Sequence, residues 1–374
     1  MELSIKSKNK LKEYQYALVF SQFPSSQSLG RRFSIEEHDE DVCYFGALDP
    51  FFIDKEKIRL SPFLQRLSGV SQVFISSSRS NRLAHTEEVA FISSIIGKVL
   101  GLNEHLLEAI ALLHDFGHSF CGHLGERLIG EFAGREFRHE VMSLVIAQKI
   151  AREGRGLNLS YETLEGALNH SRAHGSLSPN PNKPQEYGVL VIADKLACVL
   201  SDLEEAIRRG HLSKEKLPPE FFALGHSHSS RLFNCIFALI KESAEKQRIS
   251  FSESETAQQF EALRQWNYHN FYYPLDNESI RVKIREDFRS AYAFLYDFFS
   301  ELDYDPLLVF ALMNDKEILN ITKVANTNRE LIFKKNFFAK FPALDIAASI
   351  PDHKKINIFN ADLDKAKFKK FDAF

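Results

Sequence analysis

The chain has 374 residues, of which 44% are hydrophobic, so it can bury a large core in one domain or in two or three small ones. Its formal net charge of −3 excludes a global positive field that would attract nucleic acid, although a local basic patch stays open. The four cysteines form no CxxC pair, which argues against a thiolate zinc site and suits reduced thiols. We find no signal peptide pattern and no apolar run of membrane-spanning length, and we therefore expect a cytoplasmic protein.

The pattern of hydrophobic residues indicates a chain built mainly of helices. Apolar side chains at helical spacing, together with capping residues, predict helices over residues 83–100, 104–114, 137–151, 161–169 and 187–209. Gly101 is expected to stop the first of these, and Asn103 and Ser160 are expected as N-caps. From residue 214 onward the pattern is mostly amphipathic and rich in phenylalanine, which again favours helices. We therefore expect an all-α fold.

The segments between these helices are less regular. Residues 21–58 are broken and polar, and we expect an irregular arm there, with a short helix near 54–67. Residues 170–185 are rich in turn formers and are expected as a loop. Residues 73–75 are the one convincing candidate for a short strand. We find no internal repeat and no flexible linker that would separate a C-terminal subdomain.

The densest group of chemically active residues is ALLHDFGHSFCGHLGE, residues 111–126. His114 and Asp115 end a very apolar helix, where an unpaired buried carboxylate would be unfavourable. His85 opens an earlier helix, and Asp194 interrupts the apolar run YGVLVIAD. An isolated His-Asp pair could be a helix end with a surface carboxylate, but four such residues on three apolar helices predict a divalent metal site. Imidazole and carboxylate ligands suit Mn, Mg, Fe, Ni or Zn without choosing between them.

Further polar residues have spacings that place them beside this site. Arg82 precedes His85 by three residues, and on the same helix face it could grip phosphate with two N–H groups. His123 and Glu126 are spaced i, i+3, so in a helix they share a face and the carboxylate could orient the imidazole for proton transfer. The alternative for Glu126 is an ordinary acid in the first turn of a helix.

The order His85, His114–Asp115, Asp194 resembles the HD-domain superfamily, and the wider sequence resembles the deoxyguanosine triphosphate triphosphohydrolase (dGTPase) family. The HD pair alone is unspecific, whereas HDxGHxxxGHxGE followed by GLNLSYExLEG is very specific; weaker similarity runs from about residue 30 to 329. The resemblance implies hydrolysis of a deoxynucleoside triphosphate to a deoxynucleoside and inorganic triphosphate, and usually a homo-oligomer. It implies an all-α helical bundle with additional C-terminal helices, divided here into an arm (1–54), a phosphohydrolase core (55–212) and a helical C-terminal region packed on the core (213–374).

The resemblance also implies roles for single residues. His123 and Glu126 match the catalytic pair of the family. His118 and His139 match positions that contact the phosphates, and Gln72 matches one that reads the sugar 3′-hydroxyl, although a solvent-facing glutamine in a short strand fits its spacing equally well. Two further positions lie on the helix that carries Asp194: Lys195, which could bind phosphate or be solvated, and Asp202, expected near the sugar.

Two departures from the family pattern concern the sugar pocket. Cys198 stands where the family commonly has tyrosine, and ITKVANTNR (321–329) aligns with the family segment DYIAGMTDR, so that an acid and an aromatic side chain would be lost near the sugar. Cysteine is much smaller than tyrosine. The pocket should therefore be roomier, with weaker discrimination against ribonucleotides, unless another side chain such as Tyr268, Tyr272 or Tyr273 fills the space.

Other features leave more than one function open. His170, His174, His226 and His228 have no assigned role, and structural or surface roles are expected. The segment KAKFKKF (365–371) could contact single-stranded nucleic acid, although a fraying amphipathic helix fits it better. The alternatives to a triphosphohydrolase are another HD-type nucleotidase or phosphodiesterase, and a catalytically weak regulator that binds nucleotide or nucleic acid.

Overall fold

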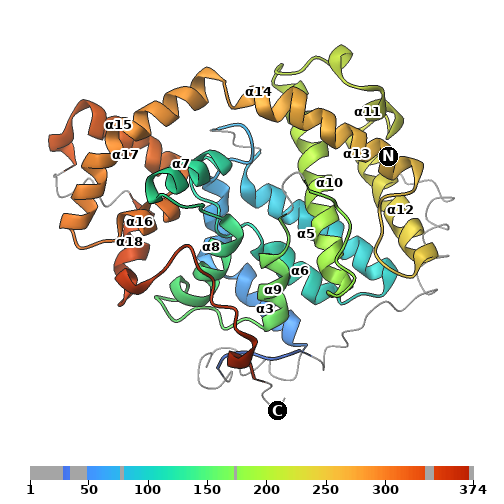
Figure 1. Ribbon diagram of the computed structural model, residues 1–374, viewed down its shortest axis with the longest axis horizontal. Helices are drawn as coiled ribbons and strands as arrows, with labels where there is room; N and C mark the ends of the chain where they lie inside the picture. Colours follow the sequence, from blue (N-terminus) through green and yellow to red (C-terminus); the bar gives the residue numbers. More distant parts are fainter. Residues whose placement is uncertain (1–27, 34–48, 76–79, 172–174, 333–340, 370–374) are drawn as a thin grey trace.

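The computed structural model describes residues 28–33, 49–75, 80–171, 175–332 and 341–369 (Figure 1). In these ranges the chain forms helices, and its only β-type pairings are isolated bridges between Arg31 and Lys369 and between Ser71 and Asn81. The predicted all-α class is confirmed. The predicted strand at 73–75 is wrong, because those residues follow a single bridge and then turn away. In the part of the chain that is described, we find no helix of the length and apolarity needed to cross a membrane.

The first described helices replace the single helix predicted near 54–67. Helix α3 covers Pro50–Arg59 and α4 covers Pro62–Arg66, followed by a 3-10 turn at Leu67–Gly69. The side chain of Asp49 accepts a hydrogen bond from the first turn of α3, and Ser61 does the same for α4. A proline follows each cap, and since proline has no backbone N–H to donate, it starts a new helix rather than continuing the old one. Of the predicted arm, residues 1–27 and 34–48 lie outside the described ranges.

The helices that carry the predicted metal ligands form as expected. Helix α5 covers Arg82–Leu100 and ends at Gly101, which has φ 67° in the left-handed region that glycine favours. Helix α6 covers Glu104–Leu113, and the side chain of Asn103 accepts a hydrogen bond from its first turn. Helix α10 covers Gln185–Arg208. The apolar faces of these helices pack together, so the central core of the molecule lies directly behind the predicted site.

Between α6 and α10 the chain forms shorter helices. Helix α7 covers His123–Ala133, α8 covers His139–Val145 and continues as a π-helix over Ile146–Ile150, and α9 covers Tyr161–Leu168. The helix predicted at 137–151 is therefore present but changes its hydrogen-bond pattern part-way. Ser160 stands at the N-cap position of α9 but does not cap it, because its hydroxyl donates to buried Asp54 instead.

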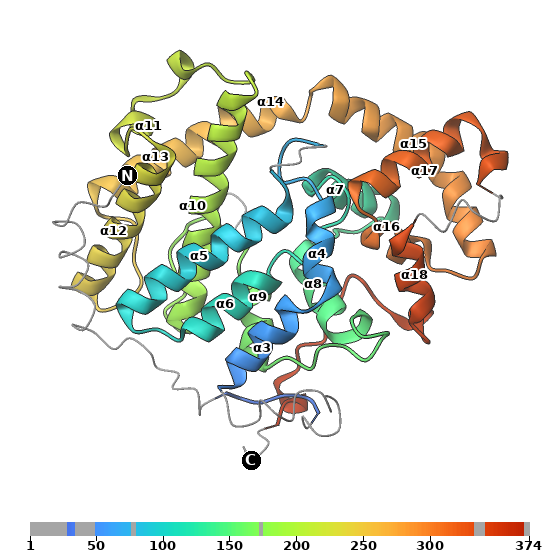
Figure 2. The same cartoon turned by 180° about the vertical axis from the view of Figure 1, so that it is seen from behind.

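The second half of the chain flanks this centre on two sides. Figures 1 and 2 show α11 (Pro219–Ala223), α12 (His228–Lys246) and α13 (Glu255–Asn267) beside α10 on one flank. A π-helix at Tyr268–Tyr272 and α14 (Tyr273–Leu275) then lead to α15 (Ser279–Glu301). The other flank is formed by α15, α16 (Pro306–Leu312), α17 (Asp315–Thr327) and α18 (Pro342–Ser349). Short 3-10 turns complete the described chain at Lys214–Lys216, Arg329–Leu331, His353–Lys355 and Lys365–Lys367.

The described end of the chain packs back onto the core. Phe368 is buried with its ring edge-on to Tyr161, at a centroid distance of 5.3 Å. Arg31 and Lys369 exchange two backbone hydrogen bonds of 3.0 and 2.8 Å. The amphipathic helix expected at 365–371 is therefore wrong for residues 365–369, which form one 3-10 turn and an extended bridge; residues 370 and 371 lie outside the described ranges.

Candidate metal centre and substrate cavity

The four residues predicted as metal ligands meet in one cluster. His85 lies in the first turn of α5, His114 is the C-cap of α6, Asp115 follows it, and Asp194 lies on α10. Nε2 of His85 lies 3.0 Å from Oδ1 of Asp194 and 3.8 Å from Oδ2 of Asp115. Nε2 of His114 lies 3.3 Å from Oδ1 of Asp115. All four residues are more than nine-tenths buried, so apolar helices hold two imidazoles and two carboxylates around one point.

The hydrogen bonding of His114 shows that this donor set suits a metal ion. Its Nδ1 lies 2.6 Å from the carbonyl oxygen of Ala111, so Nδ1 carries the proton of the neutral ring and Nε2 presents a lone pair to the cluster. That Nε2 is buried and makes no hydrogen bond. An unpartnered buried polar atom destabilises the fold, and imidazole with carboxylate is a set that divalent transition metals bind. The residues therefore fit a divalent ion.

Neighbouring cations keep both carboxylates charged. Nη1 of Arg82 lies 2.9 Å from Oδ2 of Asp115, and Nζ of Lys195 lies 3.0 Å from Oδ2 of Asp194. Burial raises the pKa of Asp115, but His114 and Arg82 outweigh it and hold that pKa well below its usual value. Burial likewise raises the pKa of Asp194, and Lys195 and His85 lower it well below its usual value. Arg82 and Lys195 also line the adjoining cavity, as their predicted contact with phosphate requires.

The predicted His123–Glu126 pair forms on the first turn of α7. Nδ1 of His123 contacts Oε2 of Glu126. The other carboxylate oxygen, Oε1, accepts hydrogen bonds from the backbone N–H of His139 at 2.7 Å and from its Nδ1 at 2.8 Å. Glu126 is therefore not an ordinary solvated acid, since it is buried and holds two imidazoles at once. The ring of His123 is 58% exposed and lines the cavity, so the pair presents an imidazole to whatever enters.

His118 and His139 lie between this pair and the metal cluster. Their rings stack at a centroid distance of 3.9 Å, and Nε2 of His118 lies 3.2 Å from Oδ1 of Asp115. Burial lowers the pKa of His139, but the Glu126 carboxylate outweighs it and raises that pKa to about 9. For His118, burial and then the charge of Arg82 keep the pKa well below its usual value. The structure thus offers a positive imidazole and a neutral one side by side.

The structure places His170, for which we expected a structural or surface role, beside the predicted site. It follows α9, is 3% exposed, and its Nε2 lies 3.2 Å from Nε2 of His139. Its ring is also edge-on to His114 at a centroid distance of 4.8 Å. Its position directly after GLNLSYETLEGALN was the available signal, because that segment ends the predicted helix beside the site. His174 lies outside the described residues.

A cavity of about 740 Å³ joins these groups to the positions predicted to lie near the sugar. The residues that line it include Gln72, Cys198, Asp202 and Tyr272 together with His118, His123, His139 and His170. Nε2 of Gln72 lies 4.0 Å from Sγ of Cys198, and its Oε1 is buried without a hydrogen-bond partner. Gln72 is only 9% exposed, so the solvent-facing alternative is wrong.

Tyr272 fills the space beside Cys198. Its hydroxyl lies 3.2 Å from Sγ of Cys198 and donates a hydrogen bond to Oδ2 of Asp202. Burial raises the pKa of Asp202 to about 6, even though the hydrogen bonds from Tyr272 and Cys198 lower it. Of the three tyrosines considered from the sequence, Tyr272 is therefore the one that replaces the missing ring, and the roomier pocket expected in the absence of such a filler does not form.

The second departure, residues 321–329, does not reach the cavity. These residues form the end of α17 and the turn after it. Asn326 donates to the backbone oxygen of Asp287 at 2.8 Å, and the guanidinium of Arg329 lies 4.6 Å from the ring centroid of Phe294. No residue of the segment lines the cavity described above. In this structure the segment therefore supplies neither an acid nor an aromatic side chain to the cavity, and the effect of this departure on sugar discrimination stays a prediction.

Two charged residues, Arg66 on α4 and Asp315 on α17, nevertheless connect the C-terminal helices to the site. Arg66 donates to the backbone oxygens of Leu312 at 2.7 Å and of His118 at 2.9 and 3.0 Å. Asp315, in the first turn of α17, accepts from the backbone N–H groups of Ser71 at 3.1 Å and of Cys121 at 2.6 Å. These contacts fix the backbone next to Gln72 and His123, and sequence spacing gave no sign of them.

Comparison with known proteins agrees with this geometry. The HD domain family model matches residues 82–198, which include all four predicted ligands. The chain is 37% identical over 261 residues to a deoxyguanosinetriphosphate triphosphohydrolase-like protein of Clostridium perfringens (strain SM101 / Type A), covering 66% of this chain and 72% of the relative. A protein of the same description from Desulfatibacillum aliphaticivorans is 32% identical over 294 residues, covering 75% of this chain and 81% of the relative. This chain belongs to the deoxyguanosinetriphosphate triphosphohydrolase-like family.

Membership in this triphosphohydrolase-like family confirms the resemblance seen in the sequence. It makes the chain an HD-type phosphohydrolase, and the buried histidine and aspartate cluster is consistent with the divalent metal that HD domains bind. Another relative, from Clostridium tetani (strain Massachusetts / E88), is 33% identical over 246 residues, covering 64% of this chain and 69% of the relative. The roles of single residues, the homo-oligomer and any contact with single-stranded nucleic acid stay predictions.

Proposed function

We propose that this chain hydrolyses deoxynucleoside triphosphates to deoxynucleosides and inorganic triphosphate. The observation that carries the proposal is a cavity that is lined by Asp115 and Asp194 of the His/Asp cluster, by the His123–Glu126 pair and by the Gln72–Asp202–Tyr272 group. A substrate with a sugar at one end and a polyphosphate at the other would contact all three groups. The relatives whose names describe triphosphohydrolase-like proteins support the same substrate class.

The phosphate side of the cavity has the charge that a polyanion requires. A divalent ion held by His85, His114, Asp115 and Asp194 supplies Lewis acidity, which activates water and stabilises charge on phosphoryl oxygens. Around these ligands, the side chains of Arg82, Lys195 and His139 would bind the triphosphate, and each is held by a carboxylate that fixes its direction. His118 would donate a neutral N–H to the same group.

The His123–Glu126 pair would serve proton transfer. The carboxylate of Glu126 fixes the ring of His123 by its contact with Nδ1, which leaves the opposite nitrogen for the substrate. In this position His123 would give a proton to the departing 5′-oxygen when water attacks the α-phosphorus. Because Glu126 also holds His139, it would position both a proton donor and a phosphate-binding group.

The sugar side of the cavity would favour deoxynucleotides. Gln72 can donate to and accept from a 3′-hydroxyl, and its buried Oε1 lacks a partner in the protein. The Tyr272 ring, fixed by Asp202, would form the wall against which a 2′-hydroxyl collides.

The test is to identify the phosphate product. The full chain is incubated with each dNTP and Mn²⁺ or Mg²⁺ in ¹⁸O-water, and we expect deoxynucleoside together with triphosphate that carries the label. The His123→Ala variant should lose turnover by about 10²–10⁴-fold. His226→Ala, at an exposed histidine, is the matched control and should keep it.

Two outcomes would contradict the proposal. Orthophosphate as the sole primary product would indicate the nucleotidase alternative, because cleavage would then occur at the terminal phosphate. A failure to turn over any nucleoside triphosphate with any divalent metal would instead favour the regulator.

A further inference from the structure

The cavity continues past the positions predicted to lie near the sugar. Val73 follows Gln72 directly along the chain, and Asp276 follows Tyr272 by four positions. Val73, Asp276 and Arg281 all line the same cavity. A substrate whose phosphates lie at the His/Asp cluster and whose sugar lies beside Gln72 and Tyr272 would place its nucleobase against these residues.

Two arginine side chains hold the carboxylate of Asp276 in place. Nη2 of Arg127, in the second turn of α7, donates to Oδ1 of Asp276 at 2.7 Å, and Nη1 of Arg281 donates to the same oxygen at 3.0 Å. Nη2 of Arg281 donates to the backbone oxygen of Val73 at 2.6 Å. The carboxylate is therefore fixed to the backbone beside Gln72, the residue predicted to contact the 3′-hydroxyl.

One oxygen of this carboxylate is left for a ligand. Both arginines donate to Oδ1 of Asp276, whereas Oδ2 accepts no hydrogen bond from the described residues. The side chain is 36% exposed, so a molecule in the cavity can reach Oδ2. Since an ionised carboxylate can only accept hydrogen bonds, it binds groups that carry N–H or O–H donors.

Val73 and Leu275 supply apolar surface on the same side of the cavity. They are 7% and 4% exposed and belong to one small hydrophobic cluster, against which the side chain of Tyr272 also packs. Both residues line the cavity together with Asp276. Ligand pockets combine apolar walls with a few fixed polar groups, and a flat ring with N–H groups on its edge fits this combination. A nucleobase is such a ring.

The four nucleobases differ in the donors that they offer on their pairing edge. Guanine presents an N–H and an NH₂ group side by side, and both can donate to a carboxylate. Adenine and cytosine present one NH₂ group next to the lone pair of a ring nitrogen, and thymine presents one N–H between two carbonyl oxygens. A carboxylate repels those lone pairs, so it favours guanine over the other three bases.

We propose that Asp276 is a specificity-determining residue, which accepts hydrogen bonds from guanine and so selects dGTP among the deoxynucleoside triphosphates. The inference rests on the proposed function, since it requires a nucleotide that binds with its sugar beside Gln72. It deepens that function because it assigns the choice of base to one carboxylate.

The test compares kcat/KM for the four dNTPs, measured with the full chain and Mn²⁺. We expect the native chain to prefer dGTP. Asp276→Asn should lower the ratio of kcat/KM for dGTP to kcat/KM for dATP by about 10–100-fold, the effect of one hydrogen bond to a charged group. Asp287→Asn is the matched control and should leave the ratio unchanged, because Asp287 is also ion-paired and 39% exposed but is not among the described residues that line the cavity.

Binding of the free nucleosides separates this inference from the proposed function, because it needs no hydrolysis. In titration calorimetry the native chain should bind deoxyguanosine more tightly than deoxyadenosine, and Asp276→Asn should remove the difference. A native chain that hydrolyses all four dNTPs equally well or prefers another base would overturn the role of Asp276, as would a preference for dGTP that survives in Asp276→Asn. Nucleoside selectivity that depends on Asp276, without turnover of any dNTP, would refute the proposed function alone.

Discussion

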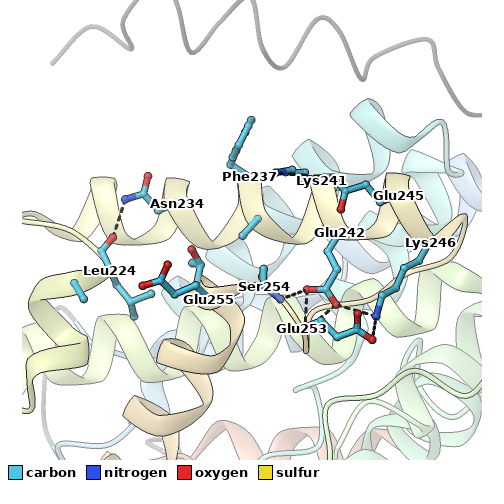
Figure 3. A pocket seen from close by; sticks show the side chains of 13 residues that line it. Leu224, Asn234, Phe237, Lys241, Glu242, Glu245, Lys246, Glu253, Ser254 and Glu255 are labelled. Carbon is cyan, nitrogen blue, oxygen red and sulfur yellow. Dashed lines mark hydrogen bonds and ion pairs between the residues drawn. The ribbon is translucent and has the colours of Figure 1, made fainter.

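The contribution of Glu242 to the free energy of unfolding can be predicted from its hydrogen bonds. It lies on α12 and is 4% exposed, and Figure 3 shows its carboxylate beside Glu253 and Ser254. The carboxylate accepts a hydrogen bond from the hydroxyl of Ser250 at 2.7 Å. It also accepts from the backbone N–H groups of Ser252, Glu253 and Ser254 at 2.9, 3.1 and 3.0 Å. Burial raises the pKa of Glu242, but these donors outweigh it and lower that pKa from 4.5 to about 2. Such a shift corresponds to about 3 kcal/mol of folding free energy.

We predict that Glu242→Gln lowers the free energy of unfolding by up to about 3 kcal/mol at neutral pH, because an amide lacks the charge and turns N–H groups toward the same donors. The pKa is depressed in the folded chain, so the stabilisation is complete above pH 4.5 and is lost as the pH falls toward 2. Urea unfolding gives the difference in free energy of unfolding between the native chain and Glu242→Gln. This difference should be about 1 kcal/mol smaller at about pH 4 than at about pH 7.

Glu245→Gln is the matched control for this measurement, because Glu245 lies on the same helix with a side chain that is 63% exposed. It should change stability by less than about 0.5 kcal/mol at either pH. The reasoning is refuted if Glu242→Gln unfolds at the same urea concentration as the native chain. It is also refuted if the difference in free energy of unfolding between the native chain and Glu242→Gln is larger at the lower pH.

Three further predictions concern the proposed substrate cavity and the contacts beside it. Asp315→Ala should lower the free energy of unfolding by about 2–4 kcal/mol, because it leaves the buried N–H groups of Ser71 and Cys121 unpaired, and kcat should fall as well. An unchanged urea midpoint would show that these two contacts do not stabilise the fold. Tyr272→Ala should lower the ratio of kcat/KM for a dNTP to kcat/KM for its ribonucleotide by about 10-fold or more. An unchanged ratio would show that Tyr272 is not the side chain that excludes the 2′-hydroxyl. Cys198→Tyr should reduce turnover, because the introduced ring would collide with Tyr272. Stronger discrimination against ribonucleotides in that variant would contradict the position of Tyr272 beside Cys198.

The parts of the fold that sequence predicts are those fixed by local chemistry. Asn103 and Gly101 bound their helices because a side-chain cap and a left-handed glycine act within one turn. His114 and Asp115 could be identified as candidate ligands because His85 and Asp194 also place polar side chains where the apolar pattern predicts core. The structure brings them together with His85 and Asp194, while their binding of metal stays a prediction.

What sequence could not predict depends on contacts between distant segments. Tyr272 reaches Cys198 across 74 positions of the chain, so no spacing rule connects them. Asp315 reaches Cys121 across 194 positions, and the segment 321–329 was placed near the sugar by alignment although its helix packs elsewhere. Residues 73–75 have the composition of a strand but find no partner strand in the described chain, since the neighbours available to them are helices.

The bridge between Arg31 and Lys369 has a consequence for how the protein is made. Ribosomes release the chain from its N-terminus, so Arg31 emerges long before its backbone partner exists. The HD helices can collapse while synthesis continues, but the pair of hydrogen bonds that ties residue 31 to residue 369 cannot form until residue 369 has left the ribosome. Closing a loop of this length is slow compared with helix formation. We therefore expect this pairing to form after the helices of the HD domain, against Asp54 and the start of α9.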